Sequence, residues 1–166
     1  SKIDELNIEL NVSHPVKYYA WTVQKKSDIT TYNLHNNYES NLTYDIIDNK
    51  PVLTTYKDNP VKSAALELNG VERTPFYEGN YYNYITSYEL NLNTPIDGIN
   101  FYSFSLLPKD VQPSGTCNFS KINDKNIKIA FANNDTSTIT NKPLYFFGVN
   151  YNVLIITDGM GAIRYA

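Results

Sequence analysis

Hydrophobic and polar residues alternate at the start of the chain. Apolar side chains stand at every second position from Leu6 to Val12, which is the period-two pattern of a strand with one buried face. Pro15 then interrupts the pattern, because proline has no backbone N–H to donate to a strand ladder. Extended character resumes over residues 16–23. This part of the sequence therefore predicts two strands.

Five further segments have strand character. They are rich in β-branched and aromatic residues, and turn residues such as Asn69-Gly70 lie between them. They span residues 63–68, 81–90, 99–107, 126–131 and 144–157, and a shorter strand is expected near residues 52–56.

The two most apolar segments, residues 99–107 and 144–157, are expected to supply the core. The first has apolar side chains on both faces, as a strand deep inside a sandwich does. The candidates from these two segments, Phe101, Phe104, Leu106, Val153 and Ile155, are expected to include core residues.

Two long polar segments, residues 25–59 and 132–142, separate the strands. Their backbone groups could not be buried cheaply, so we expect both segments to face outward or toward neighbouring subunits. No window shows sustained 3.6-residue periodicity, and no helix longer than about three turns is expected. The pattern as a whole predicts one all-β domain, a sandwich or a barrel.

The composition agrees with a sheet-rich fold and limits the partners. The 166 residues include 15 Tyr and 7 Phe, which favour the half-buried surface of a sheet. The net charge is -3, and the only adjacent basic pair is Lys25-Lys26. A nucleic-acid-binding protein needs a basic stripe to displace counterions, so we expect no direct contact with nucleic acid. No apolar run approaches the roughly 18 residues of a membrane span.

The residues that could carry chemistry are few and scattered. Cys117 is the one cysteine, so no internal disulfide can form, and we expect it to be a small buried or loop residue. A catalytic thiol would need His14 or His35 as its base, and neither histidine lies at metal-ligand spacing from other ligands. The chain has no G-x-S-x-G elbow and no glycine-rich phosphate loop. We therefore expect no enzyme activity, no metal and no cofactor.

The tyrosines and the glycosylation triplets admit binding roles. Exposed aromatic rings could form a stacking platform for sugars, which keeps a carbohydrate-binding sandwich as an alternative. The spread of the tyrosines over every predicted strand favours a role in the core and in subunit contacts instead. N-x-S/T triplets begin at Asn11, Asn41, Asn118 and Asn134. Of these, Asn41 and Asn134 fall in polar loops and are the candidate glycan carriers.

The most specific segment of the chain is residues 112–120. It reads Gln112-Pro113-Ser114-Gly115-Thr116-Cys117-Asn118-Phe119-Ser120 and resembles the Q-P-S-G-T-x-N-F-S signature of the major capsid proteins of nucleocytoplasmic large DNA viruses. Four further blocks resemble that family in the same order. They are His14-Pro15-Val16-Lys17 with Trp21 and Gln24, residues 66–70 with Arg73, residues 102–106 with Pro108, and Asn150-Tyr151-Asn152-Val153-Leu154 with Gly159-Met160-Gly161.

The chain departs from the family pattern at a few positions. Lys121 and Asn123 stand where the family often has the Arg and Asp of S-R-I-D. Ile155 replaces a usual Arg, and Arg164 stands where a small or apolar residue is common. These changes leave the expected fold intact, but an interface salt bridge inherited from the family is not expected.

The resemblance implies a fold and a function. Proteins of this family carry two jelly rolls in tandem, and three chains form a pseudo-hexagonal capsomer of an icosahedral shell. Residues 1–166 resemble the C-terminal jelly roll, without the first jelly roll and without the opening strands of the second. The resemblance assigns structural roles to the motif residues Gln112, Pro113, Ser114, Gly115, Thr116, Asn118, Phe119, Ser120, Asn150, Tyr151 and Asn152.

The resemblance also implies partners and a location. The partners would be further copies of the chain, minor capsid proteins and an underlying viral membrane that the protein does not enter. The location would be the virion, after assembly in the host cytoplasm. Residues 1–166 expressed alone should aggregate or oligomerise, because unpaired sheet edges invite pairing with other chains. Besides the carbohydrate-binding sandwich, a viral scaffold protein of the same fold is an alternative.

Overall fold

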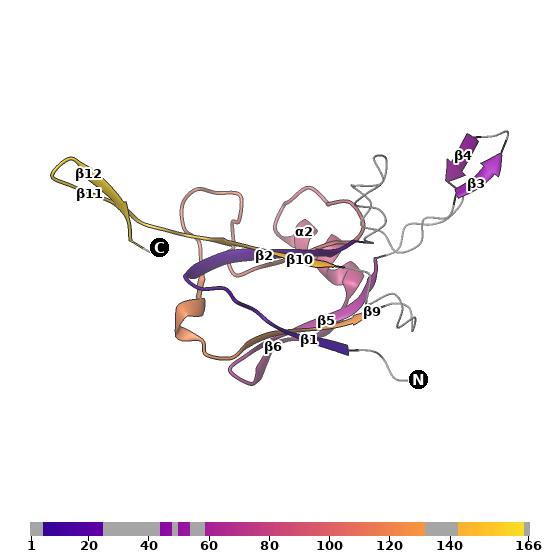
Figure 1. Ribbon diagram of the computed structural model, residues 1–166, viewed down its shortest axis with the longest axis horizontal. Helices are drawn as coiled ribbons and strands as arrows, with labels where there is room; N and C mark the ends of the chain where they lie inside the picture. The colour runs from indigo at the N-terminus through magenta and orange to yellow at the C-terminus, as the bar shows by residue number, and fades with distance from the viewer. Residues whose placement is uncertain (1–4, 25–43, 48–49, 54–58, 132–142, 165–166) are drawn as a thin grey trace.

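The computed structural model describes residues 5–24, 44–47, 50–53, 59–131 and 143–164. Two antiparallel sheets face each other and form a β-sandwich (Figure 1). The lower sheet in Figure 1 has the strand order β1-β9-β5-β6, and the upper sheet has the order β10-β2-β7, with the short β8 beside β2. The bounds of these strands are β1 (Glu5–Glu9), β2 (Pro15–Val23), β5 (Val61–Leu68), β6 (Val71–Glu78), β7 (Ile99–Ser103), β8 (Cys117–Asn118), β9 (Lys125–Phe131) and β10 (Leu144–Asn150).

The remaining elements are two hairpins and three short helical turns. One hairpin joins β3 (Tyr44–Ile47) to β4 (Lys50–Leu53), and the other joins β11 (Leu154–Thr157) to β12 (Met160–Ile163). The helical turns are the π-helical η1 (Tyr81–Ile85), α2 (Thr86–Glu89) and the 3-10 turn η2 (Phe119–Lys121). In the described part of the chain, the expectation of no long helix is confirmed.

The chain alternates between the two sheets as it proceeds. β1 lies in the lower sheet, β2 in the upper, β5 and β6 in the lower, β7 in the upper, β9 in the lower and β10 in the upper. Strands that are neighbours in a sheet are therefore distant in sequence, as in the pairs β1–β9 and β10–β2. This alternation is the connectivity of two interleaved Greek keys, which is how a jelly roll is built. The prediction of an all-β sandwich is confirmed.

The core lies between the sheets. Along β2, the inward side chains of Tyr19 and Trp21 are almost fully buried, and they face Ile127 and Ile129 of β9. The ring of Tyr19 contacts three other aromatic rings at centroid distances of 4.7 to 5.6 Å. The buried core cluster consists of Leu10, Val16, Tyr19, Trp21, Val23, Val61, Ala64, Leu66, Tyr82, Phe119, Ile127 and Ile129.

The predicted core residues are only partly correct. Phe104 packs against the core cluster, and Phe101 is half-buried beside Tyr18, with ring centroids 5.0 Å apart. Leu106 is 77% exposed, so its assignment to the core is wrong. The reason is that β7 ends at Ser103, whose hydroxyl donates to the carbonyl of Ser105 and turns the chain outward.

Val153 and Ile155 are also exposed, at 43% and 42%, so their assignment to the core is wrong too. The predicted strand 144–157 ends at Asn150 instead, and the chain resumes as β11 in a separate hairpin. Both residues belong to the segment that leaves the sandwich (Figure 1). Hydrophobicity alone gave no sign of this break.

The strand predicted over residues 81–90 is wrong, because this segment is helical. Side-chain hydrogen bonds hold it in that form. The hydroxyl of Thr86 donates to the carbonyl of Tyr82 at 2.8 Å, and the amide of Asn83 donates to the carbonyls of Ile96 and Ile99 at 3.1 and 2.7 Å. Strand propensity of the tyrosines is overridden here by these tertiary contacts.

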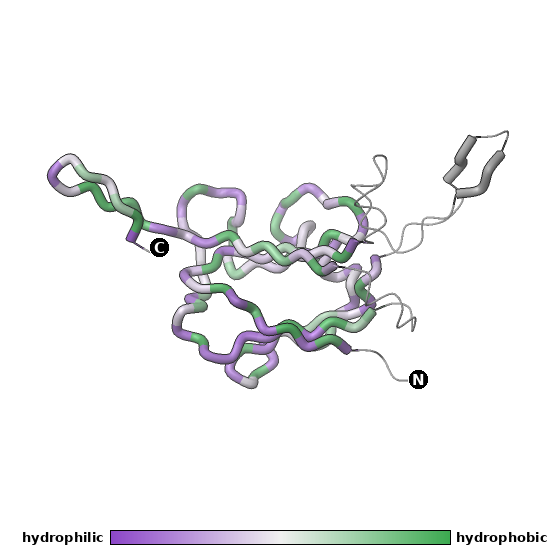
Figure 2. The backbone as a smooth tube through the Cα atoms, in the orientation of Figure 1, coloured by the Kyte–Doolittle hydropathy of each residue, from purple (hydrophilic) through white to green (hydrophobic). Residues whose placement is uncertain are grey.

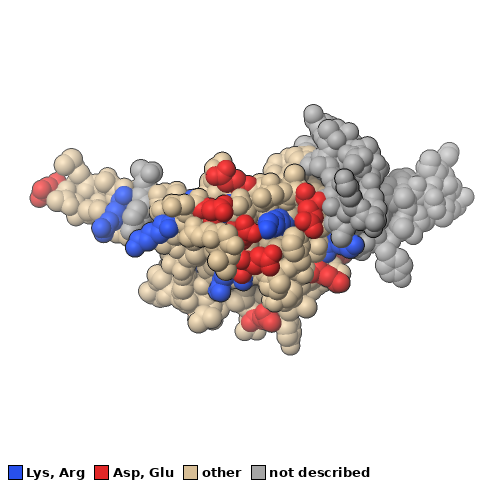
Figure 3. Space-filling view, turned by 90° about the horizontal axis from the view of Figure 1, so that it is seen from below, with Lys and Arg blue, Asp and Glu red and all other residues tan. Residues whose placement is uncertain are grey.

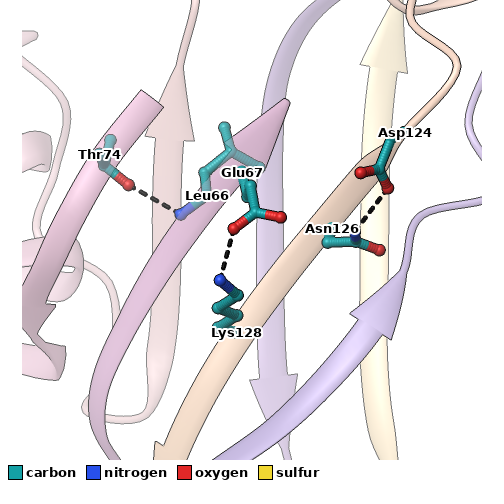
Figure 4. A network of polar contacts seen from close by, with 6 residues as sticks. All are labelled: Leu66, Glu67, Thr74, Asp124, Asn126 and Lys128. Atoms are coloured by element: carbon teal, nitrogen blue, oxygen red, sulfur yellow. Dashed lines mark hydrogen bonds and ion pairs between the residues drawn. The ribbon is translucent and has the colours of Figure 1, made fainter. Parts of the chain in front are cut away.

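The lower sheet carries polar contacts on its strands (Figure 4). Lys128 of β9 forms an ion pair with Glu67 of β5, and this hydrogen bond raises the pKa of Lys128. The hydroxyl of Thr74 on β6 accepts from the backbone N–H of Leu66 at 2.9 Å. These contacts tie the neighbouring strands together. Asn69 and Gly70, with φ of 52° and 75°, form the tight turn between β5 and β6 that the sequence predicts.

Candidate functional site

The family-like motif segments meet at the start of β2, and we call this region the motif junction (residues 14–17, 112–120 and 150–152). The backbone N–H of His14 donates to the hydroxyl of Ser120 at 2.8 Å, and the N–H of Phe119 donates to the carbonyl of His14 at 3.1 Å. The N–H of Tyr151 donates to the carbonyl of Pro15 at 2.9 Å. Three segments that are far apart in sequence are therefore joined here.

Ser114 and Gly115 close the loop that precedes β8. The hydroxyl of Ser114 lies 2.6 Å from that of Ser105 and accepts from the N–H of Leu107 at 2.9 Å. Gly115 has a φ of +133°, and a Cβ there would lie 2.7 Å from the carbonyl oxygen of Phe104. Ser114 is thus explained by the hydrogen bonds of its hydroxyl. Gly115 is explained by the close approach of the Phe104 backbone, which leaves no room for a Cβ.

Gly115→Ala is expected to lower the free energy of unfolding by about 1–3 kcal/mol, because it combines an unfavourable φ with a backbone clash. The matched control is Gly70→Ala, which also has a positive φ but has no atom within 4 Å of the added Cβ. Urea unfolding of both variants should show the larger loss for Gly115→Ala. If both variants lost the same free energy of unfolding, the close contact between position 115 and the Phe104 carbonyl would not restrict the side chain there.

Asn118 and Phe119 anchor the end of the motif in the core. The side-chain oxygen of Asn118 accepts from the N–H of Ser120 at 3.1 Å and caps η2. Phe119 is fully buried, with its ring centroid 5.1 Å from that of Tyr19 and 5.4 Å from that of Phe104. The motif residues Gln112, Pro113 and Thr116 are exposed, and no contact in the described part of the chain explains why these residue types stand there.

Lys17 links the motif loop to the C-terminal segment. It is 7% exposed, and its ammonium donates to the carbonyl of Asp110 at 2.6 Å. The same ammonium lies 5.3 Å from the centroid of the Tyr151 ring, which is within range of a cation–π contact. Beyond Tyr151, the side chain of Asn152 accepts from the N–H of Val153 at 2.8 Å. Lys17 therefore helps to hold the root of the β11–β12 hairpin.

Arg73 connects the two sheets beside the motif junction. It hydrogen-bonds Tyr102 of β7, although burial, the larger effect, still raises the pKa of that tyrosine. Burial also raises the pKa of Cys117, against a smaller opposing effect of Arg73. A thiol with a raised pKa stays protonated at neutral pH and is a poor nucleophile. Arg73, Tyr102 and Cys117 thus lie close together between the sheets. From the sequence, Arg73 stands out only as a member of a motif block.

Several sequence expectations fall outside the described residues. These are the candidate glycan carriers Asn41 and Asn134, the histidine at position 35 and the polar segment 132–142. Glycosylation at Asn41 and Asn134 stays a prediction. Within the described ranges, no group of three His, Cys, Asp or Glu side chains could hold a metal ion. None of the helices described is long and apolar enough to cross a membrane.

The β11–β12 hairpin was not expected from the hydrophobic pattern. Asp158 and Gly159, with φ of 52° and 77°, form its turn, and an Asp-Gly pair between apolar residues is a strong hairpin signal. That signal could have located β12. The hairpin projects away from the sandwich (Figure 1) and is rich in apolar residues (Figure 2).

The molecular surface shows no dominant charge in the view of Figure 3. Acidic and basic side chains are interspersed on this face, and the projecting hairpin is mostly uncharged. No continuous basic stripe is visible among the described residues on this face.

Comparison with known proteins identifies similar chains. A family model described as "Large eukaryotic DNA virus major capsid protein" matches residues 1–162. The major capsid protein of Phaeocystis pouchetii virus is 40% identical over 109 residues, which cover 66% of this chain and 21% of that protein. The major capsid protein of Paramecium bursaria Chlorella virus 1 is 30% identical over 187 residues, which cover 96% of this chain and 43% of that protein.

Solved structures show the same likeness. The PBCV-1 virus capsid, in its quasi-atomic model, matches with a TM-score of 0.79 and 28% identity over 100% of this chain and 47% of that one. The Faustovirus major capsid protein, with a TM-score of 0.67 and 18% identity, shares the fold. The chain therefore spans less than half the length of these relatives. The jelly-roll prediction is confirmed by the match to the PBCV-1 capsid structure.

Proposed function

Because this chain belongs to the major capsid protein family of large eukaryotic DNA viruses, we propose that it builds the protein shell of such a virus. The observation that carries the proposal is the family match, which extends over residues 1–162. The sandwich suits a mechanical role, since a core as closely packed as an organic crystal resists deformation. The motif junction adds to this, because it ties three distant segments of the chain to one another.

The finer parts of the proposal concern architecture. We propose that residues 1–166 form the C-terminal jelly roll of a longer capsid polypeptide, which agrees with the 47% coverage of the PBCV-1 capsid chain. Three such polypeptides would form a pseudo-hexagonal capsomer in the virion, assembled in the host cytoplasm. Minor capsid proteins and an underlying viral membrane would be its neighbours. The role is structural, with no catalytic step and no direct contact with nucleic acid.

The buried aromatic rings do not support the carbohydrate-binding alternative. A sugar platform needs accessible aromatic rings, but Trp21 is 2% exposed and lies 5.1 Å from the ring of Tyr82, which is also buried. Tyr19 is likewise part of the core. The expectation that the aromatic rings fill the sandwich holds for only part of the described residues. Tyr19, Trp21, Tyr82 and Phe119 are buried, whereas Phe76, Tyr77, Tyr84, Tyr88, Tyr145 and Phe147 are exposed.

The capsid role is tested by purifying virus particles and identifying their proteins by mass spectrometry. We expect peptides of this chain in the most abundant protein of the particle, because a shell needs many copies. Recovery only from infected cells, and not from particles, would favour the scaffold alternative and contradict the capsid role.

A further inference from the structure

The two sheets of the sandwich differ in their number of strands. The lower sheet has four strands, whereas the upper sheet has three long ones, β10, β2 and β7. A complete jelly roll has eight strands in two sheets. No strand in the described part of the chain pairs with the outer edge of β10. In the longer polypeptide that we propose, this edge is therefore the place of an upstream strand, which precedes β1 and completes the upper sheet.

The direction of the upstream strand follows from its neighbours. Every strand pair among the described residues is antiparallel. A strand antiparallel to β10 begins beside Asn150, where β10 ends, and it ends beside Leu144. β1 begins at that second end of the sandwich (Figure 1), so the chain can pass directly from the upstream strand into β1. The polypeptide before the upstream strand, which includes the first jelly roll, therefore enters next to Asn150.

The β11–β12 hairpin, which we call the arm, leaves the sandwich at this same place. It projects beyond the end of β10 and is rich in apolar residues (Figures 1 and 2). Its root is fixed, because the N–H of Tyr151 donates to the carbonyl of Pro15 at 2.9 Å, and the ring of Tyr151 lies 5.3 Å from the ammonium of Lys17. The arm is thus held in the region where the first jelly roll joins the sandwich.

One face of the arm is aliphatic and uncovered. Residues opposite each other in an antiparallel hairpin share a face, so Leu154 and Ile156 lie on the same face as Ile163. All three side chains are at least 60% exposed, and neither strand of the arm contains a charged residue. A two-stranded hairpin standing alone in water is marginally stable at best. Apolar residues grouped on a projecting element indicate a surface that packs against another part of the protein.

We propose that the face of the arm formed by Leu154, Ile156 and Ile163 packs against the first jelly roll of the same polypeptide. The inference rests on the proposed capsid function, which supplies the longer polypeptide. The chain covers 47% of the PBCV-1 capsid chain, so the remainder of such a protein is long enough for another jelly roll of this size. Because that jelly roll is joined to the sandwich beside Asn150, its effective concentration at the arm exceeds that of a separate chain. The contact fixes the orientation of the two jelly rolls relative to each other, which a pseudo-hexagonal capsomer requires.

The contact is tested in the full-length polypeptide, which contains the upstream strand. Ile156 is replaced by p-benzoylphenylalanine, which on irradiation forms a covalent bond to a neighbouring C–H group. We expect a product with the mass of one chain, in which residue 156 is linked to a peptide that precedes residue 1. The matched control carries the same label in place of Thr157, which lies on the opposite face of the arm. It should give several-fold less of this product.

A charge on the same face gives a second measurement. Ile156→Asp in the full-length polypeptide should speed amide hydrogen exchange over residues 154–163 about tenfold or more, because a carboxylate buried in the contact would lack a partner. Thr157→Asp places the same charge on the opposite face and should exchange like the unaltered chain.

The inference is overturned if the cross-linked product has the mass of two chains, if residue 156 is linked only to residues 1–166, or if no product forms. Equal hydrogen exchange in the two Asp variants would also overturn it. These outcomes leave the capsid role standing, because that role is decided by recovery of the chain from purified particles. Absence of the chain from particles would contradict the capsid role, whatever the cross-link shows.

Discussion

Replacing Phe119 by alanine should lower the free energy of unfolding by about 3–5 kcal/mol, the usual loss when a buried phenylalanine is truncated. Phe119 has no exposed surface, and its ring packs against those of Tyr19 and Phe104. It also lies at the start of η2, where the motif enters the core. The cavity would therefore open where the upper sheet and the motif junction meet.

The effect is measured by urea unfolding at low protein concentration. Leu106→Ala is the matched control, since Leu106 is also a large apolar residue next to the motif but is 77% exposed. Its loss should stay within about 0.5 kcal/mol, as for most surface substitutions. If the two variants lost similar amounts, the placement of the core at Phe119 would be wrong.

Most of the strands that sequence reasoning located contribute buried residues to the core. β2, β5 and β9 show alternation or compact apolar runs because they contribute several buried residues to the core. β1 also alternates, although Ile8 is its one partly buried residue. β6 was missed because Thr74 is its one buried residue and charged residues surround it. A strand that buries so little leaves almost no periodic signal.

Other differences arise where tertiary contacts decide. The helical form of residues 81–90 depends on hydrogen bonds from the side chains of Asn83 and Thr86 to backbone carbonyls of β7. No local sequence pattern reveals these contacts. Hydrophobicity likewise cannot distinguish a residue buried in the core from an apolar residue that stays exposed. For this reason the expectation included Ile155, which lies exposed on the β11–β12 hairpin.

The sequence marks the motif residues as a group, but it does not reveal their contacts. Sequence similarity marked Ser114 and Lys17, yet the partners Ser105 and Tyr151 come from other parts of the chain. Those pairings require the fold to bring β2, the loop and the C-terminal segment together. The sequence therefore identifies residues of the motif junction, whereas only the structure shows which of them are in contact.

The second large effect concerns alkaline pH. Burial raises the pKa of Tyr82 to about 12, with a smaller opposing effect from its hydrogen bond to Thr74, and burial also raises the pKa of Tyr19. In the unfolded chain both tyrosines ionise near pH 10. Above that pH the unfolded state has released protons that the folded state still holds, so stability falls as the pH rises. The contribution of Tyr82 is fully present below pH 10 and is lost between about pH 10 and 12, which amounts to about 3 kcal/mol.

Urea unfolding at pH 8, 10 and 11 should show this decline, and Tyr82→Phe should flatten it. At pH 8 the variant is expected to be less stable by about 1–3 kcal/mol, because the carbonyl of Ala64 loses the hydroxyl that donates to it at 2.9 Å. Above pH 10 its stability should fall less steeply, since one ionising group has been removed from the unfolded state. Tyr88→Phe, at a tyrosine that is 82% exposed, should follow the unaltered chain at every pH. An unchanged slope for Tyr82→Phe would show that the buried hydroxyl at position 82 does not govern alkaline unfolding.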